Sequence, residues 1–227
     1  MKASQKLLAY KIYLTLAALF ITSLVVSNLI FQKFFSWDFF GIHTFEISVG
    51  ILPYPITFLV TDLISEIYGK QKANQVVIAG IFASFFSLLI IYVSDIAPAT
   101  SWSPVGDKLF TKVFGLSIIA VFSSMIAYLL AQFVDIKIYH YWKKVTKGKH
   151  LWLRNNFSTI TSQFLDTFSV LFLLCSFGVI EWKLFSILLL NGFLFKVLIA
   201  LLDTPILYLA VHYFRKIFKL EIGEEID

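Results

Sequence analysis

Polar side chains interrupt two long apolar stretches in the C-terminal half of the chain. Gln163 and Asp166 lie in the stretch over residues 157–180, and Lys196 lies in the stretch over 184–211. Residues three apart on a helix project from one face, so Gln163 and Asp166 would act together. An ionisable group at the centre of a membrane costs on the order of 2.5–3.5 kcal/mol, and such groups face a partner, a cavity or a substrate. If the two stretches are neighbouring antiparallel helices, Asp166 and Lys196 can meet and bind a polar solute.

Asn191 and Asp203 extend this set along the last apolar stretch. Lys196 and Asp203 are seven residues apart and share a helical face, and Asn191 lies on an adjoining face. Two interpretations remain open: a structural ion pair that locks two helices together, and a binding site. Buried ion pairs are weak evidence for stability, because desolvation can exceed the Coulomb attraction. Two acids, one base and two amides exceed what a lock requires, so the pattern favours a binding site.

The stretch over residues 47–68 contains the tract Pro53, Tyr54 and Pro55. Two prolines remove two backbone donors from a helix, so we expect a break at membrane depth that frees the carbonyl groups of residues 49–52. Unwound backbone in a membrane is tolerated where it is buried in protein or lines a cavity. The alternative is a proline kink that shapes helix packing alone.

Three acidic residues lie closer to the predicted helix ends. Asp62 and Glu66 share a helical face, and Asp62, the deeper of the two, is the better candidate for a site. Glu66 is expected to be solvated or paired with Lys70. Asp135 lies near the inner interface, where we expect it to face Lys137 and water.

The elements that must carry these residues are transmembrane helices. The 227 residues are 59% hydrophobic with a mean hydropathy of +0.82, and 15% are charged, against about 25% in soluble chains. A helical span needs roughly 20 mainly apolar residues. The sequence therefore predicts an all-α integral membrane bundle of six transmembrane helices, forming a single domain over residues 1–227. The predicted spans cover residues 12–31, 47–68, 76–93, 113–134, 157–180 and 184–211.

The placement of charge predicts the orientation of this bundle. Basic residues gather before residue 12 and at 70–72, 137–154 and 215–219, which would all lie on one side of the membrane. The other side would carry Lys33, Lys108, Lys112 and Lys183. The positive-inside rule then places both termini in the cytoplasm. The net charge of +5 would face anionic membrane lipid rather than nucleic acid.

Sequence motifs of other protein classes are missing. There is no phosphate-binding loop of the form G-x-x-x-x-G-K-[ST], no H-E-x-x-H and no G-x-S-x-G. The four histidines have no metal-ligand spacing within a span: His43, His140, His150 and His212. We therefore expect a protein that is not an enzyme, with no catalytic residue, metal or cofactor of its own. Whether it forms a homo-oligomer or needs an energising partner stays open.

Several tracts along the chain carry a resemblance to a known family. They are PITFLVTDL at 55–63 with YG at 68–69, SMIAY at 124–128 with Gln132 and Asp135, LWLRNNFSTITSQFLDT at 151–167, and FKVL at 195–198 with TP at 204–205. With these tracts the chain resembles the queuosine precursor transporters of the vitamin uptake transporter family. The resemblance implies six helices similar to the substrate-binding subunits of energy-coupling-factor transporters. It also implies a bacterial cell membrane location and deazapurine precursors of queuosine as substrates.

The chemistry of such a substrate fits the candidate residues. A guanine-like edge presents adjacent N–H donors that the Asp166 carboxylate can accept in bidentate fashion, with complementary bonds from Gln163 or Asn191. Stacking on the flat ring is worth roughly 1–3 kcal/mol and could come from Tyr54, Phe164 or Phe195. The leading hypothesis is an importer that binds a planar heterocycle among the second, fifth and sixth helices. The alternatives are a binding subunit of a larger importer and a structural membrane protein.

Overall fold

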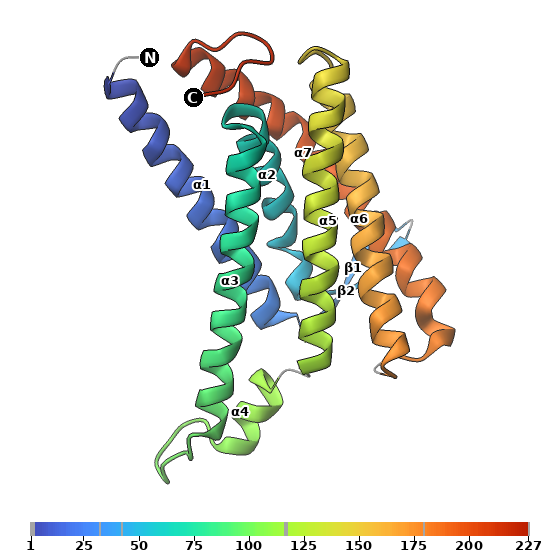
Figure 1. The fold of residues 1–227 in the computed structure, drawn as a ribbon. Helices are drawn as coiled ribbons and strands as arrows, with labels where there is room; N and C mark the ends of the chain where they lie inside the picture. Colours follow the sequence, from blue (N-terminus) through green and yellow to red (C-terminus); the bar gives the residue numbers. More distant parts are fainter. Residues whose placement is uncertain (1–2, 32, 42, 116–117, 179, 227) are drawn as a thin grey trace.

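The structure, a computed structural model, describes residues 3–226 except 32, 42, 116–117 and 179, and it is mostly helical (Figure 1). The helices are α1 (Ala3–Ile30), α2 (Tyr54–Ile67), α3 (Gly69–Ile96), α4 (Asp107–Phe114), α5 (Ile118–Val145), α6 (Leu151–Ser176) and α7 (Phe185–Phe218). Two short 3-10 turns, η1 (Val49–Ile51) and η2 (Trp182–Leu184), lie before α2 and α7. An antiparallel hairpin, β1 (Phe34–Phe39) and β2 (His43–Ser48), joins α1 to η1.

Five segments of the described chain are long and apolar enough to cross a membrane: α1, Val49–Ile67, α3, α6 and Trp182–Phe218. The 28-residue helix α5 runs alongside α6 (Figure 1). That α5, which contains most of the predicted fourth span, also crosses the membrane stays a prediction. Both termini lie at one end of the bundle, together with the α2–α3 and α5–α6 connections (Figure 1). We call this the terminal end, and its cytoplasmic location stays a prediction from its basic charge.

Helix α2 lies at the centre of the bundle (Figure 1), and its polar side chains are buried along with its apolar ones. Its 14 residues give a helix of about 21 Å, shorter than the roughly 30 Å of membrane hydrocarbon. Because α2 ends at the terminal end, its first residue, Tyr54, must lie inside the bundle. The turn η1 and the hairpin complete this crossing.

The predicted proline break takes a different form in the structure. Pro53 caps the start of α2 and Pro55 lies in its first turn, where a missing N–H leaves no helical bond unmade. The backbone before Tyr54 is not α-helical, but its carbonyl groups are not all free. The carbonyl oxygen of Val49 accepts from the Leu52 N–H at 3.1 Å, and that of Gly50 accepts from the Ser27 hydroxyl at 2.5 Å. The prediction of freed carbonyl groups was therefore wrong for these two residues.

Gly50 brings this segment against α1. A Cβ atom at this position would lie 2.7 Å from the carbonyl oxygen of Ser27 and 2.8 Å from the Cβ of Phe31. A helix backbone atom and a Cβ atom cannot move away to relieve such a contact. The glycine therefore lets the chain pass close to α1 and start α2 at its central position.

The hairpin is a small sheet that the sequence did not predict, in a chain that is otherwise mostly helical as expected. Phe45 and Ile47 alternate with the exposed Thr44 and Glu46, so one face of β2 is apolar. That face packs on Phe195 of α7. The strands have six residues each and stand between apolar helices. A hydropathy pattern alone does not separate such short strands from the neighbouring membrane spans.

The helices also extend beyond the predicted apolar spans. α3 begins at Gly69 rather than residue 76, α5 continues to Val145 rather than 134, and α7 continues to Phe218 rather than 211. α6 begins at Leu151 and ends at Ser176, whereas the predicted span covered 157–180. Hydropathy detects the part of a helix within hydrocarbon, while the backbone hydrogen-bond ladder continues into the interface. Residues 116–117 and 179, within two of the predicted spans, lie outside the described residues.

Candidate functional site

An ion pair joins α6 and α7 in the middle of the bundle. The Lys196 Nζ donates to Asp166 Oδ2 at 2.6 Å, and the two side chains are 12% and 6% exposed. Asp166 is the sixteenth residue of α6, which places it about 22 Å along the helix from the terminal end. The contact expected from the sequence is therefore present. The two residues meet because α6 and α7 are neighbours joined by a short connection.

Tyr54 adds a third element to this pair. The Lys196 Nζ lies 4.8 Å from the centre of the Tyr54 ring, within cation–π distance. The Tyr54 phenol group is in hydrogen-bond contact with the Asp166 carboxylate. The start of α2 inside the bundle is what brings this ring to the depth of the ion pair.

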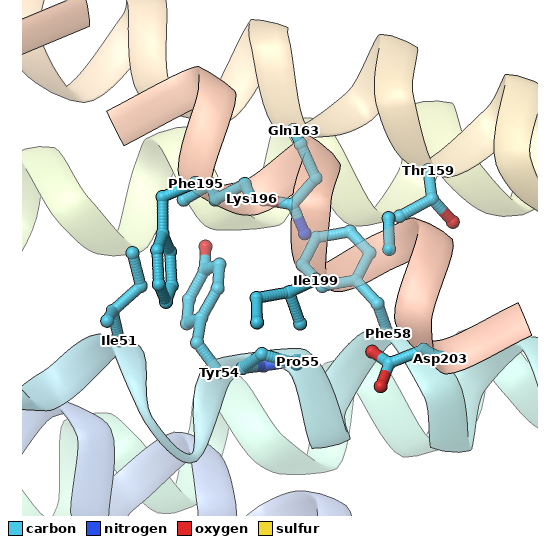
Figure 2. Close-up of a pocket in the computed structure, with 11 residues that line it drawn as sticks. Ile51, Tyr54, Pro55, Phe58, Thr159, Gln163, Phe195, Lys196, Ile199 and Asp203 are labelled. Atoms are coloured by element: carbon cyan, nitrogen blue, oxygen red, sulfur yellow. The ribbon is translucent and has the colours of Figure 1, made fainter. Parts of the chain in front are cut away.

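Tyr54 and Lys196 line a small cavity between α2, α6 and α7 (Figure 2), and Asp166 contacts both of them. The volume of the cavity is about 20 Å³, which leaves room for about one water molecule. The amide oxygen of Gln163, a buried side chain on its wall, accepts no hydrogen bond from the described residues. The lining residues are Ile51, Tyr54, Pro55, Phe58, Thr159, Gln163, Phe195, Lys196, Ile199, Ala200 and Asp203. The cavity is therefore small and has both polar and apolar groups on its walls.

The seven residues predicted for a site fall into two groups. Tyr54, Gln163, Lys196 and Asp203 line the cavity, and Asp166 contacts two of them. Asn191 is half-buried on α7 and does not line this cavity. Asp62 does not line it either and contacts α5 and α6 instead.

The two phenylalanine candidates for stacking also differ in their positions. Phe195 is buried on the cavity wall, whereas Phe164 is 46% exposed on the outer face of α6. Phe195 packs edge-on against Trp37 and Phe45 of the hairpin, with ring centres 5.6 and 5.8 Å apart. The hairpin therefore supports one wall of the cavity.

A second small cavity lies on the other side of Tyr54. Its volume is about 10 Å³, and it is lined by residues of α1, α3 and α5 as well as by Tyr54. The hydroxyl group of Ser84 on its wall is buried and makes no hydrogen bond within the described residues. The Tyr54 side chain is thus a shared wall between two cavities that each contain an unpaired buried polar atom.

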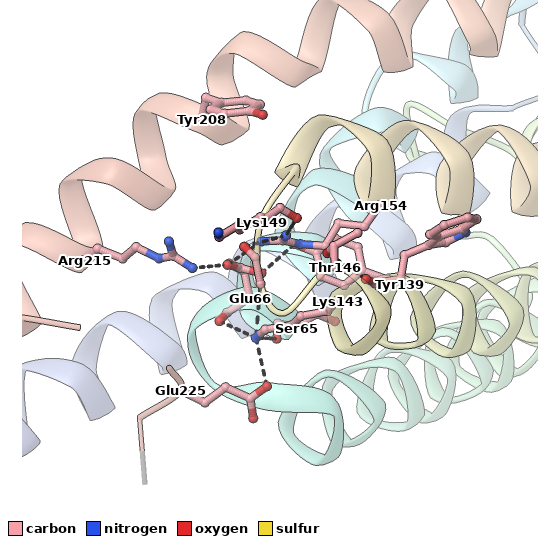
Figure 3. A network of polar contacts seen from close by, with 12 residues as sticks. Ser65, Glu66, Tyr139, Lys143, Thr146, Lys149, Arg154, Tyr208, Arg215 and Glu225 are labelled. Carbon is pink, nitrogen blue, oxygen red and sulfur yellow. Dashed lines mark hydrogen bonds and ion pairs between the residues drawn. The ribbon is translucent and has the colours of Figure 1, made fainter. Parts of the chain in front are cut away.

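Glu66 holds a buried charge cluster at the terminal end (Figure 3). Arg154 donates to its carboxylate at 2.6 Å, Arg215 forms a second ion pair, and the Lys143 Nζ lies 3.7 Å away. The Tyr139 hydroxyl donates to it at 3.0 Å. The expectation that Glu66 is solvated or paired with Lys70 was wrong, because α5, α6 and α7 all close over this end of α2.

The C-terminal segment completes this cluster. Lys143 also pairs with Glu225 at 2.9 Å, and the N–H of Ile226 donates to the carbonyl oxygen of Ile67 at 2.8 Å. One signal in the sequence could have revealed the cluster. The chain has two arginines, Arg154 and Arg215, and both stand among lysines at helix ends on the same predicted side. Arginine suits buried carboxylate pairs better than lysine does.

Asp62 and Asp135 form a second buried acidic feature, between α2 and α5. They are 2% and 0% exposed, and their carboxyl groups are in hydrogen-bond contact with each other. Thr159 donates to Asp62 at 3.3 Å and Ser162 donates to Asp135 at 2.9 Å. The expectation that Asp135 faces Lys137 and water was wrong, because α6 covers this face of α5.

Comparison with known proteins identifies the family of this chain. A family model described as "Putative vitamin uptake transporter" matches residues 48–210, more than half of the chain. A Bacillus subtilis (strain 168) protein named "Probable queuosine precursor transporter" is 26% identical over 167 residues, covering 72% of this chain and 71% of that protein. No solved structure matches the chain. The matched segment contains Tyr54, Asp166 and Lys196, together with most of the apolar helices. The chain belongs to the vitamin uptake transporter family and is a multi-pass bacterial membrane transporter, not an enzyme.

Proposed function

We propose that this transporter imports a deazapurine precursor of queuosine across the bacterial cell membrane, and that it binds the base between α2, α6 and α7. The observation that carries the proposal is the group of complementary polar atoms around one mid-depth cavity. A carboxylate, an ammonium and an unpaired amide oxygen meet there beside two aromatic rings. The name of the Bacillus subtilis relative supports the substrate class.

The recognition would exchange one set of bonds for another. The amino-pyrimidinone edge of a deazaguanine presents adjacent N–H donors, which the Asp166 carboxylate can accept as a bidentate pair. Its carbonyl oxygen can accept from Lys196, and the free Gln163 oxygen can accept a further N–H. A ligand with this edge would therefore replace the Lys196–Asp166 bond while leaving both charged groups hydrogen-bonded, which a buried polar group requires.

Tyr54 would have to move for the base to enter, because neither cavity alone holds a bicyclic ring. A ligand that takes over Asp166 would also replace the phenol contact that holds Tyr54 in place. The released ring could then turn, join the two cavities and stack on the base. The unpaired hydroxyl of Ser84 in the second cavity would meet the distal part of the ligand.

The experiment that tests this function is uptake by the purified chain alone in lipid vesicles, using a labelled deazaguanine base. Time-dependent accumulation inside vesicles, with competition by unlabelled deazaguanine and none by adenine, is the expected result. Binding without accumulation would support the alternative of a binding subunit that needs an energising partner. If the chain neither binds nor accumulates the labelled base, the proposed substrate class is rejected.

A further inference from the structure

The Asp62–Asp135 pair holds two acids that form no ion pair with a cation in the described part of the chain. The buried cations pair elsewhere: Lys196 with Asp166, and Arg154 and Arg215 with Glu66. Two carboxylates in contact away from water repel each other strongly, so one of them must carry a proton.

The unpaired atoms of the pair agree with a shared proton. Apart from the contact within the pair, the Oδ1 atom of Asp62 and the Oδ2 atom of Asp135 accept no hydrogen bond from the described residues. Their second oxygens are occupied by Thr159 and Ser162. Two carboxyl groups in contact, each with one oxygen unoccupied, hold a proton between them as a coupled pair.

The pair stands between the cavity and the terminal end. Thr159 lines the substrate cavity and its hydroxyl donates to Asp62, so one side chain borders both places. In the other direction, Glu66 follows Asp62 by one helical turn and leads to the surface through Lys143 and the part-exposed Glu225. Arg154, whose charge acts on Asp62, has a buried Nε–H without an acceptor, a vacant donor site that a water molecule can occupy.

We propose that Asp62 and Asp135 together form an exchangeable proton-binding site, and that import of each substrate molecule is coupled to the inward passage of one proton through this pair. The inference rests on the proposed transport function and adds its driving force. The proton binds from outside while the cavity is loaded and leaves at the terminal end; no bond of the substrate changes. Thr159 couples the two sites, because its side chain borders the ligand on one side and its hydroxyl donates to Asp62 on the other.

None of the titratable groups named below, which lie around the pair, is a better site for the exchangeable proton. From α2 the neighbour is Glu66, which is held by its cations, and from α5 the neighbours are Tyr128 and Tyr139. From α6 the neighbour is Arg154, and α7 contributes Arg215 by way of Glu66. The tyrosines are neutral acids and the cations are engaged with Glu66.

The test uses the full chain in lipid vesicles that contain a pH-sensitive dye. With one proton per substrate, an inward gradient of about one pH unit can support about tenfold accumulation of labelled deazaguanine. Adding unlabelled deazaguanine at equal pH should acidify the vesicle interior. The variant Asp135→Asn should lose both responses while binding deazaguanine and exchanging labelled for unlabelled base across the membrane. Glu46→Gln, which changes an exposed carboxyl on β2, is the matched control and should keep both responses.

The outcomes separate this inference from the transport proposal. Wild-type protein that exchanges deazaguanine without responding to the gradient would overturn proton coupling and leave the transport function standing. Proton coupling is equally overturned if Asp135→Asn keeps both responses. Infrared spectroscopy gives a readout without substrate: at neutral pH the wild type should show a protonated carboxyl band that Asp62→Asn and Asp135→Asn both lose. Spectra without such a difference would refute the shared proton even if deazaguanine proves to be the wrong ligand.

Discussion

The Nζ atom of Lys196 lies 2.6 Å from Oδ2 of Asp166, with both side chains nearly buried between α6 and α7. A ligand cannot bind either group fully without replacing this bond. An apolar solute would leave two buried charges unpaired, and an anion would compete with Asp166 for the same cation. A neutral solute with N–H donors beside a carbonyl oxygen satisfies both groups, so the pair itself selects for an amide-like edge.

Replacing Asp166 by asparagine should weaken deazaguanine binding by about 10- to 150-fold, because hydrogen bonds to a charged group contribute about 1.5–3 kcal/mol. The asparagine amide also has an NH2 group in place of the second acceptor oxygen that the two ligand N–H groups need. Equilibrium binding to the purified protein measures the loss, and thermal unfolding confirms that the variant folds. Binding near the wild-type level would remove Asp166 from the site.

A double substitution separates a binding site from a structural lock. Lys196→Met leaves the buried Asp166 without its counter-charge and should lower the free energy of unfolding by about 3–5 kcal/mol. The pair Lys196→Met with Asp166→Asn should regain most of that stability but no uptake. If the double variant regains uptake as well, the ion pair is a lock between helices and the site lies elsewhere.

Tyr54 and Phe164 were equal candidates for stacking in the sequence, and the structure separates them. Tyr54→Ala should reduce deazaguanine affinity by roughly 5- to 150-fold, because base stacking contributes roughly 1–3 kcal/mol. Phe164→Ala, on the outer face of α6, should bind the base as the wild type does. Fluorescence-quenching titrations of both variants provide the comparison, and equal losses in the two would argue against Tyr54 as the moving wall.

Glu66 should matter far more to stability than Glu225, although both pair with Lys143. Glu66→Gln leaves buried cations without their partner, which should cost about 3–5 kcal/mol. The Glu225 side chain is 39% exposed, so Glu225→Gln should cost at most about 1 kcal/mol. Chemical unfolding in detergent measures both. Equal effects would mean that water screens the Glu66 cluster.

His140, at the terminal end beyond the predicted fourth span, gives the protein a pH-dependent stability. Burial, assisted by the charge of Lys143, lowers the pKa of His140 from 6.5 to about 4. Between these values the unfolded chain binds a proton that the folded chain does not, so stability falls as the pH falls from 6.5 to 4. His140→Asn should flatten the dependence of the thermal midpoint on pH in this window. The exposed His212→Asn is the control, and an unchanged slope in His140→Asn would reject the assignment.

Local pattern was enough to predict the membrane class and the contact between Asp166 and Lys196. Charged side chains in hydrocarbon are costly, so their presence within apolar stretches already implies a buried partner. Because a short connection makes α6 and α7 neighbours, each partner could be found from its position along the chain. The presence of long helices followed from apolar runs, while their ends did not, because the backbone ladder continues beyond the hydrocarbon.

Tertiary structure decided which other polar groups are buried. Glu66 and Arg154 are 88 residues apart, and neither position looks buried until α5, α6 and α7 close over the end of α2. Asp62 meets Asp135 in the same way, through the packing of α2 against α5. The hairpin and the prolines place Tyr54 at the depth of Asp166, which no periodicity encodes. Spacing along one helix fixes a face, but the burial of that face depends on distant segments that pack against it.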